Sequence, residues 1–223
     1  MNECAPVSCG CTSDVKFHGL SRDYKARLWA VIALNASMFA VEMGGGVLAG
    51  SQALQADALD FLGDTLTYGM SLAVIGLSLR VRATAALIKG ATLALMGLWV
   101  LGATMWHAFV LGTPRAEVMG LLGMLALAAN VASVLILIKY KDGDANVRSV
   151  WLCSRNDAIG NVAVMLAALG VWGTATSWPD IIVATILASL FLNSAGKILR
   201  QALDEWRSAR SAQTQHSAVT SVK

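Results

Sequence analysis

The sequence predicts an all-α membrane protein, a six-transmembrane-helix bundle with both termini cytoplasmic. Of its 223 residues, 56% are hydrophobic and only 14% are charged, whereas a soluble domain usually carries about 25% charged residues. The mean hydropathy of +0.60 agrees with this class. Six apolar stretches are each close to or above the roughly 20 residues that a helix needs to cross a bilayer. They are 28–50, 54–79, 85–111, 118–138, 150–172 and 181–199.

Each stretch is expected to be a helix, because lipid offers no partner to an unpaired backbone polar group. The polar breaks between the stretches lie at 51–52, 80–82, 113–115, 141–144 and 176–179. Pro114 and Pro179 fit the first turn of the helix that follows each of them. Asp180, directly after Pro179, is expected to cap a helix, and Glu42 is expected to pair with a neighbour.

Lysine and arginine predict the orientation of the bundle, since they concentrate on the cytoplasmic side of membrane proteins. One side carries Arg115 alone, and the other carries every basic cluster next to a span. The basic side has Lys16, Arg22, Lys25, Arg27, Arg80, Arg82, Lys89, Lys139, Lys141, Arg148, Lys197, Arg200, Arg207, Arg210 and Lys223. Both termini are therefore expected in the cytoplasm of a multi-pass protein of the bacterial plasma (inner) membrane. No basic patch interleaved with aromatic residues suggests nucleic acid.

The two ends of the chain differ from the membrane domain at 23–203. Residues 1–22 are expected to form a flexible, Cys-rich cytoplasmic tail, and residues 204–223 a short disordered one. The first residues have no apolar core, so no cleavable signal peptide is expected. Cysteines in the cytoplasm stay reduced. Cys9, Cys11 and His18 are therefore either metal ligands or plain unstructured groups.

Carboxylates inside the apolar stretches are the most informative residues of the chain. Asp57, Asp60 and Asp64 lie on one stripe of the second stretch, at spacings typical of one helix face. Asp157 lies in the fifth stretch, one turn after Cys153. A carboxylate at the centre of a membrane helix costs roughly 2.5–3.5 kcal/mol on insertion scales. Several such residues indicate a compensating partner, and a cation bound between the two helices is the simplest one.

The donor types suggest which cation. Asp60, Asp64, Cys153 and Asp157 offer oxygen and sulfur ligands that suit a tetrahedral Zn²⁺ or a similar ion. The sulfur disfavours Mg²⁺ and Ca²⁺. Three other interpretations stay open: Asp157 pairs with Arg155, Asp57 hydrogen-bonds to a neighbouring helix, and Cys153 packs as a small hydrophobic residue.

Two segments resemble the cation diffusion facilitator family of divalent-metal/proton antiporters. Residues 51–64 read SQALQADALDFLGD and follow Asn35 and Val41-Glu42, and residues 146–164 read NVRSVWLCSRNDAIGNVAV. The resemblance extends over about 22–203. It implies a six-helix membrane domain, usually dimeric, with one central metal site. Matched residue by residue, that site consists of Asp60, Asp64, Cys153 and Asp157.

The chain departs from the family pattern in two ways. Cys153 stands where the family usually has His or Asp, so Asp57, Asn156 and Asn161 are alternative fourth donors. Only about 20 residues follow Leu203, too few to bury a core. A short form without the family's C-terminal cytoplasmic domain is therefore expected, with a homodimer, if any, formed through the transmembrane helices.

The predicted function is export of a divalent transition metal, foremost Zn²⁺, from the cytoplasm in exchange for protons. Cd²⁺, Co²⁺, Fe²⁺ and Ni²⁺ are the alternative ions, and no enzymatic activity or cofactor is expected. An intramembrane sensor would bind the metal without net flux, and a passive channel would conduct it through weak, multiple sites. A remote alternative is an intramembrane aspartyl protease, whose Gly-x-Gly-Asp signature is imperfect here because Phe61 replaces its first glycine.

Overall fold

The computed structural model describes residues 22–73, 79–110, 112–140 and 145–220. Within these ranges the side chains at 71, 79–80, 82, 140, 145–156 and 208–220 are not described. The helices are α1 (Arg22–Ala49), α2 (Gln52–Ala73), α3 (Leu79–Val110), α4 (Ala116–Leu137), α5 (Ala145–Thr174) and α6 (Trp178–Thr220). A short 3-10 helix, Ile138–Tyr140, follows α4. The described residues contain no strand, which confirms the all-α prediction.

Each of the six predicted stretches coincides with an α-helix over most of its described residues. Five helices are long and apolar enough to cross a membrane: α1, α3 from Ala83, α4, α5 from Asp157, and α6 up to Arg207. The sixth, α2, has 22 residues, enough to span the hydrocarbon core, but it carries the three aspartates. The three aspartates set α2 apart from the five helices that are apolar enough to cross a membrane.

The end of α6 differs from the expectation for residues 204–223. The polar composition suggested a disordered tail, but the helix continues to Thr220. No proline or glycine follows Gly196, and the segment contains three Ala, two Arg and two Gln, residues that favour helix. A helix that has already been nucleated in the membrane also extends more easily than a new one forms.

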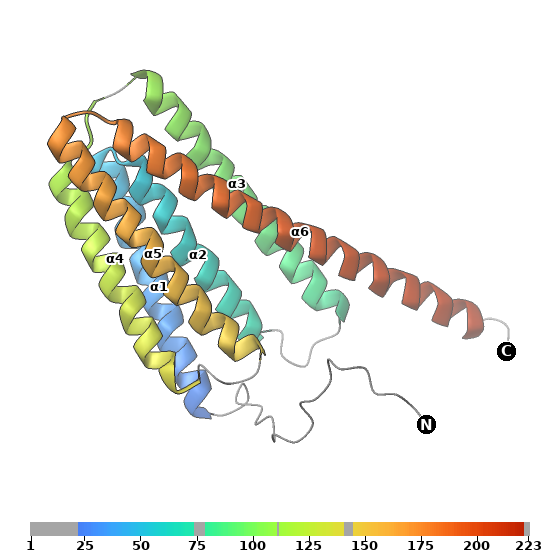
Figure 1. Cartoon of the computed structure of the whole chain (residues 1–223). Coiled ribbons are helices and arrows are strands. Elements are labelled where there is room, and N and C mark those ends of the chain that lie inside the picture. The colour runs from blue at the N-terminus through green and yellow to red at the C-terminus, as the bar shows by residue number, and fades with distance from the viewer. Residues whose placement is uncertain (1–21, 74–78, 111, 141–144, 221–223) are drawn as a thin grey trace, which may run out of the picture.

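The helices pack around α2, and the closest pairs are antiparallel (Figure 1). The closest pairs are α3 with α6, α4 with α5, and α1 with α2, and α2 also contacts α3, α5 and α6. The connections α1–α2, α3–α4 and α5–α6 lie at one end of the bundle, whereas α1 begins and α6 ends at the other (Figure 1). Residues 51–59 are buried without exception. This arrangement places the acidic helix at the centre of the fold.

A tight turn joins α1 to α2. Gly50 has a φ of +69°, a conformation that residues with a Cβ adopt only at a cost. Its N–H donates to the Val47 carbonyl at 3.2 Å, and Ser51 N–H donates to the Gly46 carbonyl at 2.9 Å. The Ser51 hydroxyl then caps α2 by accepting from Leu54 N–H at 3.1 Å.

Asp180 completes this turn from a distant part of the chain. It is 1% exposed and accepts hydrogen bonds from the Ser51 hydroxyl at 2.6 Å, from Gln52 N–H at 2.8 Å and from Ala53 N–H at 3.1 Å. The expectation that Asp180 caps a helix is therefore confirmed, and the helix is α2. Its negative charge lies at the N-terminus of α2, where the helix dipole and the free N–H groups favour an anion.

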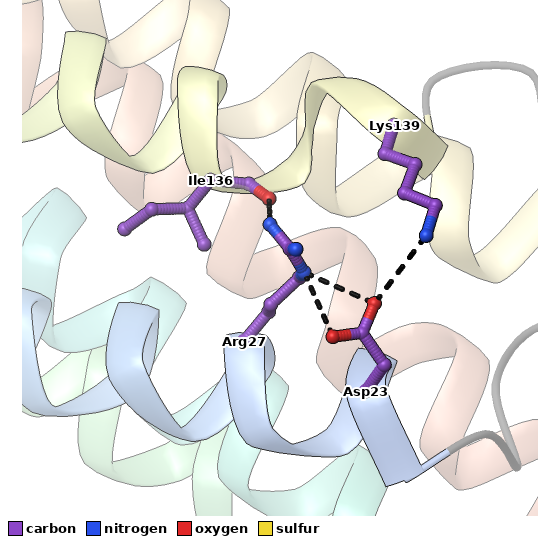
Figure 2. A network of polar contacts seen from close by, with 4 residues as sticks. All are labelled: Asp23, Arg27, Ile136 and Lys139. Carbon is purple, nitrogen blue, oxygen red and sulfur yellow. Dashed lines mark hydrogen bonds and ion pairs between the residues drawn. The ribbon is translucent and has the colours of Figure 1, made fainter.

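A polar network ties the start of α1 to the end of α4 and to the 3-10 helix that follows it (Figure 2). Arg27 contacts the Asp23 carboxylate at 3.2 Å and donates from Nη1 to the Ile136 carbonyl at 3.1 Å. Lys139 lies 3.7 Å from the same carboxylate. Since these groups are largely exposed, the network fixes the register of α1 and α4 more than it adds stability.

Candidate metal-binding site

Three of the predicted aspartates line one cavity of about 180 Å³ between α2, α3, α5 and α6. Asp60 and Asp64 enter from α2 and Asp157 enters from α5. The remaining lining residues are Gly63, Thr67, Leu93, Phe191, Ser194, Ala195 and Ile198. An acidic cavity walled by apolar side chains inside a membrane bundle is the kind of environment in which a cation finds oxygen ligands and little competing water.

Asp64 has the richest set of contacts among these acids. It is 8% exposed. Its Oδ2 accepts from Asn35 Nδ2 on α1 at 3.4 Å and from the Tyr68 hydroxyl one turn further along α2. Both donors are 1% exposed. Donors from two helices therefore hold this carboxylate in one orientation, toward the cavity and α5.

Asp157 meets Asp64 across the helix interface. Their carboxyl groups are close enough to share a hydrogen bond when one of them carries a proton. Asp60 lies within electrostatic range of both. Among the residues whose side chains are described, no three His, Cys, Asp or Glu groups are arranged to hold a metal ion. The three carboxyl groups thus line an open cavity rather than close around one point.

Asp57 lies apart from this cavity, although it shares the stripe of Asp60 and Asp64. It is 1% exposed and faces Glu42 of α1, which is fully buried. A Cβ on Gly160 of α5 would lie 3.3 Å from Asp57 Oδ1, so the glycine leaves room for the carboxylate. Both Glu42 oxygens and Asp57 Oδ2 lack a hydrogen-bond donor among the described residues. The two carboxyl groups form a separate buried pair.

The remaining candidates stand as follows. Asn161 is 1% exposed, and neither atom of its amide finds a hydrogen-bond partner in the described part of the chain. It does not line the cavity. Cys153, Asn156 and Arg155 belong to α5, but their side chains lie outside the described residues, as do Cys9, Cys11 and His18 altogether.

Two residues beside the cavity escaped the sequence analysis. Thr67 lines the cavity, and Lys89 of α3 donates from Nζ to Thr67 Oγ1 at 2.6 Å. Lys89 is only 8% exposed, so it does not belong to the cytoplasmic loop charges with which it was counted. The signal that could have revealed it is its position, because Lys89 lies inside the apolar stretch 85–111 and not before it.

The fold and the cavity together define a polytopic membrane protein of the ion-transport class. Comparison with known proteins agrees. Residues 28–205 match the cation efflux transmembrane domain, which is most of the chain, and the chain belongs to this family of transporters. This confirms the resemblance to cation diffusion facilitators and the expectation that the protein is not an enzyme.

Several bacterial relatives align with most of the chain. Zinc transporter ZitB of Yersinia pestis is 29% identical over 196 residues, 80% of this chain and 62% of the relative. Metal cation efflux system protein CzcD of Cupriavidus metallidurans is 25% identical, covering 78% of this chain and 58% of the relative. A cadmium, cobalt and zinc/H(+)-K(+) antiporter of Bacillus subtilis is 25% identical, with 83% and 64% covered. The chain thus spans about three fifths of the length of these relatives. Its family and its apolar helices identify it as a multi-pass protein of the bacterial inner membrane.

Proposed function

We propose that this protein exports a divalent transition-metal ion, foremost Zn²⁺, from the cytoplasm in exchange for protons. The observation that carries the proposal is the meeting of Asp60, Asp64 and Asp157, from two helices, at one cavity in the membrane domain. Relatives described as zinc transporters and as a cadmium, cobalt and zinc antiporter support the choice of ion. Family membership supports transport over sensing.

Proton exchange follows from the chemistry of the ligands. A carboxylate must be deprotonated to bind a metal, so metal binding releases protons and protonation releases the metal. Near-neutral cytoplasm loads the cavity, and a more acidic exterior returns protons to the aspartates and displaces the ion. Alternating access requires the helices to rock so that the cavity opens to one side at a time.

The function is tested with the full-length protein in proteoliposomes containing a fluorescent zinc indicator. An inward-directed Zn²⁺ gradient across vesicles that are acidic inside should give faster uptake than the same gradient with equal pH. An uptake rate that is the same with and without the pH difference would indicate a channel. Binding of Zn²⁺ without uptake would indicate a sensor. Either result would overturn the proposed exchange.

Cys153 is proposed as the fourth ligand, on α5 one turn closer to the cytoplasmic end than Asp157. Replacing it by Asp removes the soft sulfur and keeps an anionic donor. We therefore expect the preference for Cd²⁺ over Zn²⁺ to fall by about ten-fold, because thiolate favours softer metals. Competitive uptake of the two ions measures this ratio. An unchanged ratio would favour Asp57, Asn156 or Asn161 as the fourth donor.

The cysteines of the N-terminal segment are proposed to collect metal at the cytoplasmic entrance. Deleting residues 2–18, which removes Cys9, Cys11 and His18, should raise the Zn²⁺ concentration for half-maximal transport and leave the maximal rate unchanged. Equal half-maximal concentrations would retire this role.

A homodimer through the membrane helices is the proposed assembly. The lipid-facing side of α3 carries large exposed apolar side chains, among them Leu95, Trp99 and Phe109, and contacts on this side would leave the cavity between α2 and α5 accessible. The mass of the detergent-solubilised protein, measured by light scattering, tests the dimer.

A further inference from the structure

A basic side chain is buried beside the acidic cavity. Lys89 lies in the part of α3 that is apolar enough to cross the membrane, and 8% of it is exposed. Its Nζ donates to Thr67 Oγ1 at 2.6 Å. Leu93, one turn later on the same face of α3, lines the cavity, as Thr67 does. Lys89 therefore lies against the cavity wall, with its ammonium group close to the acids.

The position of Lys89 is costly unless its charge is used. A lysine at the centre of a membrane helix costs roughly 2.5–3.5 kcal/mol on insertion scales. Lysines near helix ends usually avoid this cost by extending to the membrane surface. Lys89 instead turns into the bundle toward α2, where its charge acts on Asp64. Its electrostatic partner is thus one of the proposed ligands.

We propose that Lys89 is the resident counter-charge of the transport cavity and offsets part of the negative charge of its acidic ligands. The inference rests on the proposed function. When ionised, the three aspartates of the cavity carry three negative charges, a Cys153 thiolate would add a fourth, and Lys89 reduces the total by one. Lys89 therefore brings the cavity with a bound divalent cation closer to neutrality, which is the state that a low-dielectric membrane interior favours.

This balance has two consequences for transport. Lys89 repels a bound cation, so it lowers the affinity of the cavity and speeds release. A lysine that only tied α3 to α2 through Thr67 would have neither effect.

The test compares Zn²⁺ binding to purified full-length variants by calorimetry and Zn²⁺ flux in proteoliposomes. Lys89→Gln removes the charge and keeps a hydrogen-bond donor. It is expected to bind Zn²⁺ about ten-fold more tightly and to turn over more slowly. Lys89→Arg restores the charge, so its affinity should be closer to wild type than to Lys89→Gln. Lys197→Gln removes an equal charge from an exposed position of α6. Its Zn²⁺ affinity and Zn²⁺ flux should equal those of wild type.

The outcomes separate the inference from the proposed function. Wild-type protein that neither binds nor transports Zn²⁺ would refute the function itself. Wild-type binding together with equal or weaker binding by Lys89→Gln would overturn the counter-charge role alone. Lys89→Met provides a second neutral variant suited to lipid. If neither neutral variant is monodisperse in detergent while Lys89→Arg is, the charge serves folding, and the counter-charge proposal is wrong.

Discussion

Replacing Asp64 by Asn is expected to reduce Zn²⁺ flux to below about 1% of wild type. Loss of an indirect partner of a metal ligand already costs 10- to 100-fold in affinity or activity, and the change at Asp64 removes a ligand itself. The substitution keeps the shape of the side chain and an oxygen that Asn35 and Tyr68 can bond. The variant should therefore insert and fold. Uptake by proteoliposomes with matched protein content measures the effect.

The same loss is expected for Asp157→Asn, since Asp157 faces Asp64 across the cavity. The matched control is Asp204→Asn, which removes an exposed carboxylate of α6 that lies 4.0 Å from Arg207. The control should transport as wild type does. Flux near the wild-type level in either Asp64→Asn or Asp157→Asn would show that this cavity does not bind the transported ion.

Replacing Asp180 by Ala should destabilise the protein by about 3 kcal/mol and lower its melting temperature by several degrees. Three hydrogen bonds to the start of α2 are lost together, and the freed N–H groups lie in a buried turn with no access to water. Asp180→Asn keeps one acceptor oxygen and should lose less. Thermal unfolding of the detergent-solubilised protein, followed by size-exclusion chromatography, measures both changes.

The effect of Asp180→Ala should be confined to stability. Asp180 lies at the turn between α1 and α2 and does not line the acidic cavity. The Zn²⁺ concentration for half-maximal flux should therefore match that of wild type when the rate is corrected for the amount of folded protein. Asp204→Ala serves as the control for removal of an exposed carboxylate. A melting temperature equal to that of wild type would contradict the capping role.

The helices could be predicted from the sequence because hydropathy is a local property. Each span is recognised from its own residues, and the lipid requires it to be helical. The role of Asp180 is not local, since it depends on a contact between residues 128 positions apart in the chain. The extension of α6 is not predicted from composition, because its Ser and Thr are typical of a disordered segment whereas its Ala, Arg and Gln favour helix.

The acids of α2 show a similar limit. Asp57 and Asp64 share a stripe, but seven residues separate them by about 10.5 Å along the helix axis. Since α5 runs antiparallel to α2, Asp64 meets Asp157, whereas Asp57 lies beside Gly160, further along α5. The helical period predicts the face of the helix on which a residue lies, but not which residue of the neighbouring helix lies opposite it. The burial of Lys89 is also not predicted, because its nearness in sequence to the loop at 80–82 places it with the cytoplasmic charges, whereas its side chain lies inside the bundle.

The unbroken course of α6 has a mechanical consequence. The helix is fastened to the start of α2 at Asp180, lines the cavity with Ser194 and continues to Thr220. At 1.5 Å per residue, Ser194 and Thr220 lie about 21 Å and 60 Å beyond the fastening point. A tilt that shifts the cavity wall by a given amount therefore swings the far end roughly three times as much. In a rigid tilt about Asp180, a small force at the far end of α6 would be enough to open or close the cavity wall.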